Sequence, residues 1–120
     1  MALTGATVIS WSSTTHGREA KALEVFGNAL QHYEQLTKDG RIHGHKEFFS
    51  LDDGGGFILL TGEVDELLRL RGEQQTIDLL ADANAIVDGL SVRSYLGGSD
   101  QTVGDQMARY TERMRALGYL

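Results

Sequence analysis

Hydrophobic and polar positions follow two different periods along the chain. Alternation around β-branched residues predicts a strand over 6–12. Over 17–38, polar residues recur every three or four positions, which is the period of a helix with one face exposed. The polar stripe is Lys21, Glu24, Asn28, Gln31, Gln35 and Lys38, and the apolar face is Leu23, Val25, Phe26, Ala29, Leu30, Tyr33 and Leu36. Thr14 and Thr15 are N-cap candidates, and Gly40 is expected just beyond the last turn.

The middle of the chain predicts a hairpin, a broken helix and a further strand. Two strands, 41–51 and 57–62, flank the sequence DDGGG, which is a strong turn signal. The periodicity over 65–83 is helical, and Gly72 interrupts it, so two pieces or a bend are expected. The segment 89–98 then predicts a fourth strand, which two consecutive glycines end.

The C-terminal segment predicts one more helix with a single apolar stripe. The stripe consists of Val103, Met107, Tyr110, Met114 and Leu117. Asp100 or Thr102 is expected to cap the helix, and Gly118 to end it. Met107 and Met114 are interpreted as core-filling residues, because methionine adapts to irregular gaps between packed elements.

The order strand, helix, strand, strand, helix, strand is that of a ferredoxin-like α+β fold, here as a single domain over 1–120 with an added C-terminal helix. In this topology the first and third strands are central, and the strands 41–51 and 89–98 lie at the edges. Charged residues on those two strands fit edge positions.

The third strand is apolar on both sides, although helices cover only one face of such a sheet. Phe57 and Leu59 point to one side of the predicted strand, and Ile58 and Leu60 to the other. An uncovered apolar sheet face marks an interface. A homodimer with the sheets face to face is therefore the expected assembly.

Charge and composition restrict the possible partners. Eleven basic and seventeen acidic residues give a net charge of −6, which argues against binding to nucleic acid or to an anionic membrane. The absence of cysteine excludes disulfides, thiolate nucleophiles and iron–sulfur clusters. No apolar run approaches the ~20 residues of a membrane helix, and no signal-peptide pattern is evident, so a cytoplasmic location is expected.

Three stretches carry a resemblance to a known group: GREAKALEVFGNAL, DGRIHGHKEFFSLDDGGGFILLTGEVDELLRLR and IVDGLSVRSYLGG. Together with the element order, they resemble the dimeric α+β barrel superfamily over most of 6–115. The resemblance is to small bacterial YCII-related and antibiotic-biosynthesis-monooxygenase-like proteins, and to EthD-like proteins. It implies a homodimer and, for any enzymatic member, chemistry on a hydrophobic organic substrate without a cofactor.

His43, His45 and Glu47 occupy every second position of the strand predicted over 41–51. Residues at this spacing share one face of a strand, in steps of about 6.6–7 Å. Two imidazoles and a carboxylate so placed could ligate a metal, and either histidine could act as a general acid or base. The alternative is an ordinary polar side of an edge strand, which Lys46 on the opposite face favours. Our expectation is that no metal is bound.

Other candidate site residues lie outside this strand. His16 follows the first strand and, with Arg18, could bind an anion near a helix N-terminus. His16, His43 and His45 are the candidate catalytic residues. Trp11, Arg93 and Tyr95 are expected, with Arg18, to shape a ligand pocket.

Three functional hypotheses remain open. The first is binding of a small hydrophobic organic molecule in a cavity on the open sheet face. The second is a cofactor-independent enzyme, monooxygenase-like or EthD-like, that uses a histidine as acid or base. The third is a non-catalytic assembly or interaction module. None of the three requires a cofactor.

Overall fold

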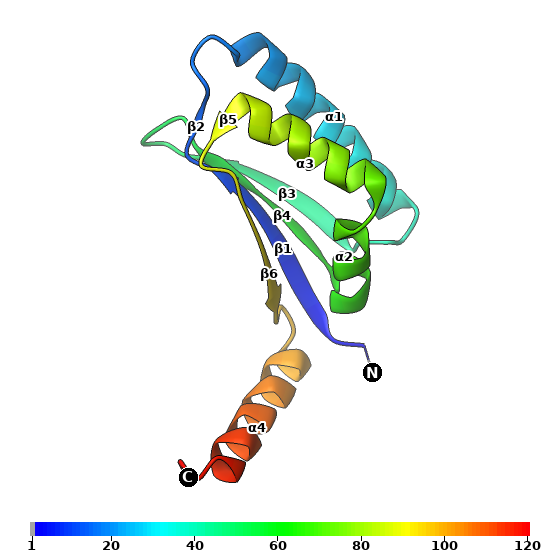
Figure 1. Ribbon diagram of the computed structural model, residues 1–120. Helices are drawn as coiled ribbons and strands as arrows, with labels where there is room; N and C mark the ends of the chain where they lie inside the picture. Colours follow the sequence, from blue (N-terminus) through cyan, green and yellow to red (C-terminus); the bar gives the residue numbers. More distant parts are fainter. Residues whose placement is uncertain (1) are drawn as a thin grey trace.

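A sheet of antiparallel strands in the order β3-β4-β1-β6 forms the centre of the fold in the computed structural model, which describes residues 2–120 (Figure 1). Its strands are β1 Thr4–Trp11, β3 Gly44–Phe49, β4 Gly56–Glu63 and β6 Ser91–Leu96. The short strands β2 Ser13–Thr14 and β5 Val87–Asp88 pair separately. The helices are α1 Glu19–Lys38, α2 Val64–Arg71, α3 Gln74–Ile86 and α4 Asp100–Ala116. Central and edge strands are as predicted, so the ferredoxin-like α+β fold is confirmed.

Helices α1 and α3 lie on one face of the sheet (Figure 1), and the side chains of the central strands alternate accordingly. On β4, Ile58 and Leu60 are 4% and 6% exposed beneath the helices, whereas Phe57 on the opposite face is 37% exposed. On β1, Ile9 is buried on the helix-covered side. The predicted two-sided character of the third long strand is confirmed. Its apolar side opposite the helices lacks a covering layer within residues 2–120.

Helix α1 packs on the sheet through Val25, Ala29, Tyr33 and Leu36, which lie three or four positions apart and are buried. Leu23, expected on this apolar face, is 77% exposed instead, because its position on the helix lies to one side of the stripe that the buried residues form. No helix within residues 2–120 is both long and apolar enough to cross a membrane.

The N-terminus of α1 differs from the prediction. Arg18 is its N-cap residue and no side chain caps it, so the capping roles assigned to Thr14 and Thr15 are wrong. Thr14 belongs to β2, and Thr15 donates from its backbone N–H to the carbonyl oxygen of Ile86 and from its hydroxyl to Asp88. These hydrogen bonds join the segment before α1 to the end of α3 and to β5, and Thr14 and Thr15 are therefore not free to cap α1.

The predicted break at Gly72 is confirmed. Helix α2 ends at Arg71, Gly72 is its C-cap, and α3 begins two residues later. Leu67 and Leu70 on α2 are buried against the sheet. Splitting the helix lets α2 pack near the start of β1 while α3 runs beside α1 (Figure 1).

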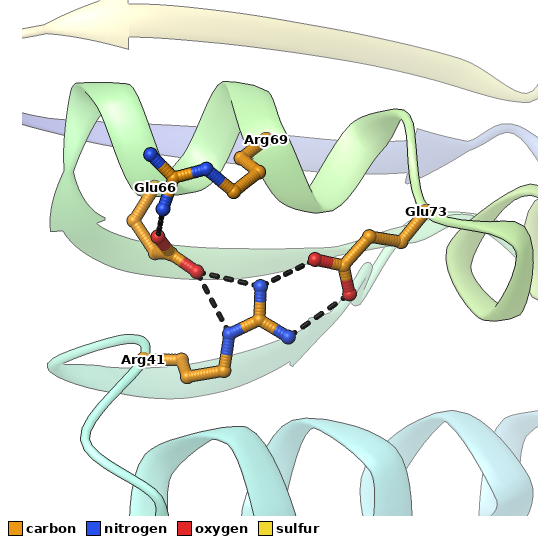
Figure 2. A network of polar contacts seen from close by, with 4 residues as sticks. All are labelled: Arg41, Glu66, Arg69 and Glu73. Atoms are coloured by element: carbon orange, nitrogen blue, oxygen red, sulfur yellow. Dashed lines mark hydrogen bonds and ion pairs between the residues drawn. The ribbon is translucent and has the colours of Figure 1, made fainter.

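An ion-pair network connects the loop after α1 to α2 and α3 (Figure 2). Arg41 donates from Nε to Glu66 at 2.7 Å and from Nη1 to Glu73 at 2.9 Å, and Arg69 pairs with the other oxygen of Glu66. Arg41 holds the pKa of Glu73 below its usual range through these bonds. The guanidinium of Arg41 thus binds two carboxylates, one along each of two edges. These bonds fix the position of the chain that leads into β3.

Helix α4 leaves the body of the molecule (Figure 1), and its apolar stripe is not in the core. Met107 is 67% exposed and Thr102 is the buried residue of the helix, so the core-filling interpretation of Met107 and Met114 is wrong for the single chain. The cap is Ser99, whose side chain accepts from the N–H of Thr102, rather than Asp100 or Thr102. The helix ends at Ala116, two residues before Gly118, much as expected.

Candidate functional site

A cavity of about 470 Å³ lies between the helix layer and the sheet, at the end where β2 and β5 meet. Apolar side chains from the two layers form most of its wall: Ile9 and Ile58 from the sheet, Val25 and Phe26 from α1, and Leu80 and Ile86 from α3. Protein interiors are normally packed without voids of this size. An apolar, largely preformed cavity is typical of a small-molecule site.

Small side chains on the helices leave this space open. Ala22 and Ala29 on α1 and Ala83 on α3 line the cavity where larger residues would fill it. Leu23 and Phe49 also line it but are 77% and 66% exposed, so they belong to its mouth. The entrance is thus apolar as well as the interior.

Three aromatic rings from three different elements form one wall. Trp11 meets the edge of Phe26, with ring centroids 6.1 Å apart and planes at 68°, and Phe26 lies 5.5 Å from Phe49. Such rings offer flat apolar surfaces and polarised edges to a bound ring. Trp11 is the one tryptophan of the chain, which makes it a direct optical reporter of the cavity.

Few polar groups reach the cavity. Glu19 and Thr14 lie in its lining where the wall is solvent-accessible, and Tyr33 contributes from the buried face of α1. Burial raises the pKa of Tyr33, and the charge of Glu47 raises it further. The phenol of Tyr33 therefore keeps its proton at neutral pH.

His45 lies next to Tyr33, outside the cavity. Its ring centroid is 6.4 Å from that of Tyr33, its Nδ1 is 2.7 Å from Glu47 Oε2, and its Nε2 is 2.9 Å from Glu34 Oε2. Burial alone would lower the pKa of His45, but the hydrogen bonds to Glu34 and Glu47 and their charges raise it above its usual value. The geometry is that of an imidazolium held between two carboxylates, which links α1 to the edge strand β3.

The charge of His45 predicts a pH-dependent stability. Because the folded-state pKa is raised, this contribution is complete below the unfolded pKa of about 6.5 and is lost as pH rises through the folded value. We expect His45→Gln to lower the free energy of unfolding more at pH 6 than at pH 9, measured by urea unfolding. His16→Gln, at a fully exposed side chain, is the control and should retain the wild-type pH dependence. Equal losses for His45→Gln at the two pH values would contradict the charged pairing.

The structure does not bring the three candidate histidines together. His16 is in an exposed loop, with its Nδ1 3.9 Å from Glu19, and His43 borders a hollow of the open sheet face that includes Leu59 and Tyr95. His45 faces α1 on the other side of the sheet. The three histidines therefore do not act together at one site within one chain.

The expectation that His43, His45 and Glu47 share one face is confirmed for His45 and Glu47 and is wrong for His43. Ile42 is 2% exposed in the core and His45 also faces the helices, so alternation breaks between them. The N–H of His43 donates to the carbonyl of Thr61, the residue paired with Gly44, so two residues face one on the partner strand. Across residues 2–120, no cluster of three His, Asp or Glu side chains is arranged to hold a metal ion.

Of the four residues expected to shape a pocket, Trp11 lines the cavity. Arg18 donates to the carbonyl of Ala85 at the end of α3. Arg93 and Tyr95 pair with Val8 and Ala6 on the open face, opposite the cavity. The cavity formed by the chain therefore lies on the helix-covered side, and not on the open face as the sequence analysis expected.

Several lining residues were missed by sequence reasoning. Phe26, Ala29 and Tyr33 were assigned to the packing face of α1, and Leu80 and Ala83 only to a helix. One signal in the sequence could have pointed to them, namely the small residues on the helix faces that point to the sheet. Such residues are compatible with a cavity and also with close packing. That signal is ambiguous without the distance between the layers.

Neither a protein-family model nor a curated protein matches the chain, whereas solved structures share its fold. A conserved protein of unknown function from Bacteroides thetaiotaomicron, described as a possible oxidoreductase, superimposes with a TM-score of 0.60 at 11% identity, covering 80% of this chain and 98% of that one. SnoaB, a cofactor-independent oxygenase from Streptomyces nogalater, gives a TM-score of 0.57 at 17% identity, covering 84% and 97%.

At these identities the similarity shows the fold and does not transfer an activity. It agrees with the α+β fold that the sequence predicts. Membership of the YCII-related or the antibiotic-biosynthesis-monooxygenase-like group stays a prediction.

Proposed function

We propose that this protein binds a small apolar organic molecule in the cavity between the helices and the sheet. The observation that carries the proposal is the cavity of about 470 Å³ with its aromatic wall of Trp11, Phe26 and Phe49. An apolar molecule with one or two oxygen atoms matches this lining, because Tyr33 supplies a protonated hydroxyl and most of the remaining wall is apolar. Planar aromatic compounds are the class that such a wall favours.

A fluorescent apolar probe tests this binding. We expect 1-aminoanthracene to increase its emission on entering the cavity and to quench Trp11, the one tryptophan, by energy transfer. Ala83→Phe places a phenyl ring in the cavity from α3 and leaves less space for the probe. We expect probe binding to weaken at least about tenfold, which corresponds to about 1.4 kcal/mol of binding free energy. The readouts are the probe titration and the far-ultraviolet circular dichroism of each variant.

Ala81→Phe is the matched control, since Ala81 is exposed on the same helix and lies outside the cavity lining. It should bind the probe as the wild type does. The proposal fails if the wild type does not bind the probe, or if a folded Ala83→Phe variant binds it as tightly as the wild type.

A second candidate function is catalysis on the bound molecule without a cofactor. The structural similarity to SnoaB, a cofactor-independent oxygenase, favours it over other reactions. In this chain Tyr33 would hold an oxygen of the substrate by donating its proton in a hydrogen bond, and the apolar wall would exclude water. Dioxygen uptake by the protein with a bound hydroxyaromatic compound decides between an oxygenase and a binding protein.

We also propose that the protein is a homodimer, with the open sheet faces in contact. The support for this proposal is the apolar face of the sheet that the helices leave uncovered. Phe48 and Phe57 stack there with centroids 4.7 Å apart, and both are more than a third exposed, as is Tyr95. A face with several exposed aromatic side chains favours a protein partner over water.

A further inference from the structure

Helix α4 begins at a fixed point on the body. The backbone N–H of Thr4 donates to Thr102 Oγ1 at 3.1 Å, and the hydroxyl of Thr4 donates to the carbonyl of Gly97 at 2.8 Å. Ser99 caps the helix by accepting from the N–H of Thr102, which is 3% exposed. The first turn is therefore tied to the start of β1, and the direction of the helix is set by these contacts.

Beyond that first turn, the helix presents an apolar stripe to solvent. The stripe consists of Val103, Met107, Tyr110, Met114 and Leu117, and the exposed fractions of Val103, Met107, Tyr110 and Leu117 are 46%, 67%, 63% and 58%. A helix of 17 residues that buries one threonine is marginal in water on its own. An apolar stripe along such a helix is typical of one that packs on another surface.

The stripe continues the open face of the sheet. Val103 Cγ2 comes within 3.9 Å of the place where a Cβ on Gly97 would stand. Gly97 in turn borders the hollow of about 470 Å³ that includes Leu59 and Tyr95 on the open face. A partner seated on the open face would therefore also meet the stripe.

Charge favours a second copy of this chain as that partner. Residues 106–120 contain three arginines and one glutamate, a net charge of +2, whereas 1–105 contain eight basic and sixteen acidic residues, a net charge of −8. The outer half of α4 is thus basic and the rest of the chain is acidic. Opposite charges of this kind steer two copies together, and they disfavour contact between two outer halves of α4.

We propose that α4 is an exchanged arm: in the homodimer, the apolar stripe of each α4 packs on the body of the other copy, with its arginines toward acidic residues there. This arrangement rests on the proposed pairing of the sheet faces and extends it. A two-fold axis makes the exchange reciprocal, so both stripes are covered at once. The arm also explains why Met107 and Met114 have the pattern of core residues, although Met107 is exposed and Met114 is only half-buried on a single chain.

The test compares two pairs of glutamates on the same helix in the full chain. Met107→Glu with Met114→Glu places charges on the stripe, and Ala108→Glu with Ala116→Glu adds as many glutamates to exposed positions away from it. Light scattering over a dilution series measures the particle mass, which is expected to be twice 13.1 kDa for the wild type. Amide hydrogen exchange over 103–117 reports whether the helix is covered.

We expect the stripe variant to dissociate at a concentration at least about tenfold higher than the wild type, and its α4 amides to exchange faster. The variant away from the stripe should remain a dimer with slow exchange. Phe57→Glu, on the open face, separates the two proposals. If Phe57→Glu gives monomers while the stripe variant stays dimeric with protected α4 amides, the arm is refuted and the sheet pairing stands. A wild type that remains at 13 kDa overturns both.

Discussion

Gly5→Ala is expected to destabilise the protein by about 3 kcal/mol, at the upper end of what overpacking costs. A Cβ on Gly5 would stand 2.2 Å from the carbonyl oxygen of Tyr95 on β6 and 2.7 Å from Val64 Cγ2 on α2. The first neighbour is backbone of a paired strand, so it cannot move without opening the sheet. Urea unfolding followed by circular dichroism measures the change, and a midpoint equal to that of the wild type would contradict the packing described for β1.

Gly27→Ala is the control for this substitution. Gly27 lies on the exposed side of α1, and a Cβ there would meet nothing within 4 Å. Since glycine is a poor helix former, alanine should raise the free energy of unfolding by about 0.5–1 kcal/mol. The same substitution is therefore expected to lower the free energy of unfolding at one position and to raise it at the other. The comparison tests the contacts at each position rather than the residue type.

Leu67→Ala is expected to cost about 2–5 kcal/mol of stability, the range for a buried leucine that leaves a cavity. Leu67 is 3% exposed and belongs to the core formed by α2 and the central strands. Its Cδ2 comes within 3.7 Å of the position of a Cβ on Gly62, so α2 packs closely on β4. The quantity to measure is the free energy of unfolding from a denaturant titration.

The neighbouring residue provides the comparison. Leu68 is 51% exposed, so Leu68→Ala should change the free energy of unfolding by about 0.5 kcal/mol or less. The two substitutions differ by one position on the same helix. Similar losses for both would mean that α2 packs in a different rotation from the one described.

The segment that contains His43 and His45 shows what a periodic pattern of residues predicts correctly and what it misses. The period of two predicted an edge strand next to a glycine turn, and the edge position is confirmed. It also placed His43 and His45 on one face, which is wrong because two residues face Thr61 on the partner strand and shift the alternation. An irregularity of one residue is a property of strand pairing, and the local sequence does not signal it.

The cavity illustrates a second limit of prediction from the sequence. The apolar face of α1 was predicted from its periodicity, and Val25, Ala29, Tyr33 and Leu36 are buried as such a face requires. Whether that face closes on the sheet or leaves a cavity depends on the separation of the two layers. Trp11 was named as a pocket residue, but for a pocket on the opposite side of the sheet.

The local pattern of residues is enough to predict the order of the elements, the central and edge strands, the break at Gly72 and the apolar character of both sheet faces. These follow from periodicity and from glycine, which act over a few residues. Three features follow from the three-dimensional packing: His45 pairs with Glu34, a cavity lies between one end of the helix layer and the sheet, and α4 leaves the body. Each of these depends on distances between segments far apart in the chain, and a local pattern of side chains contains no measure of such distances.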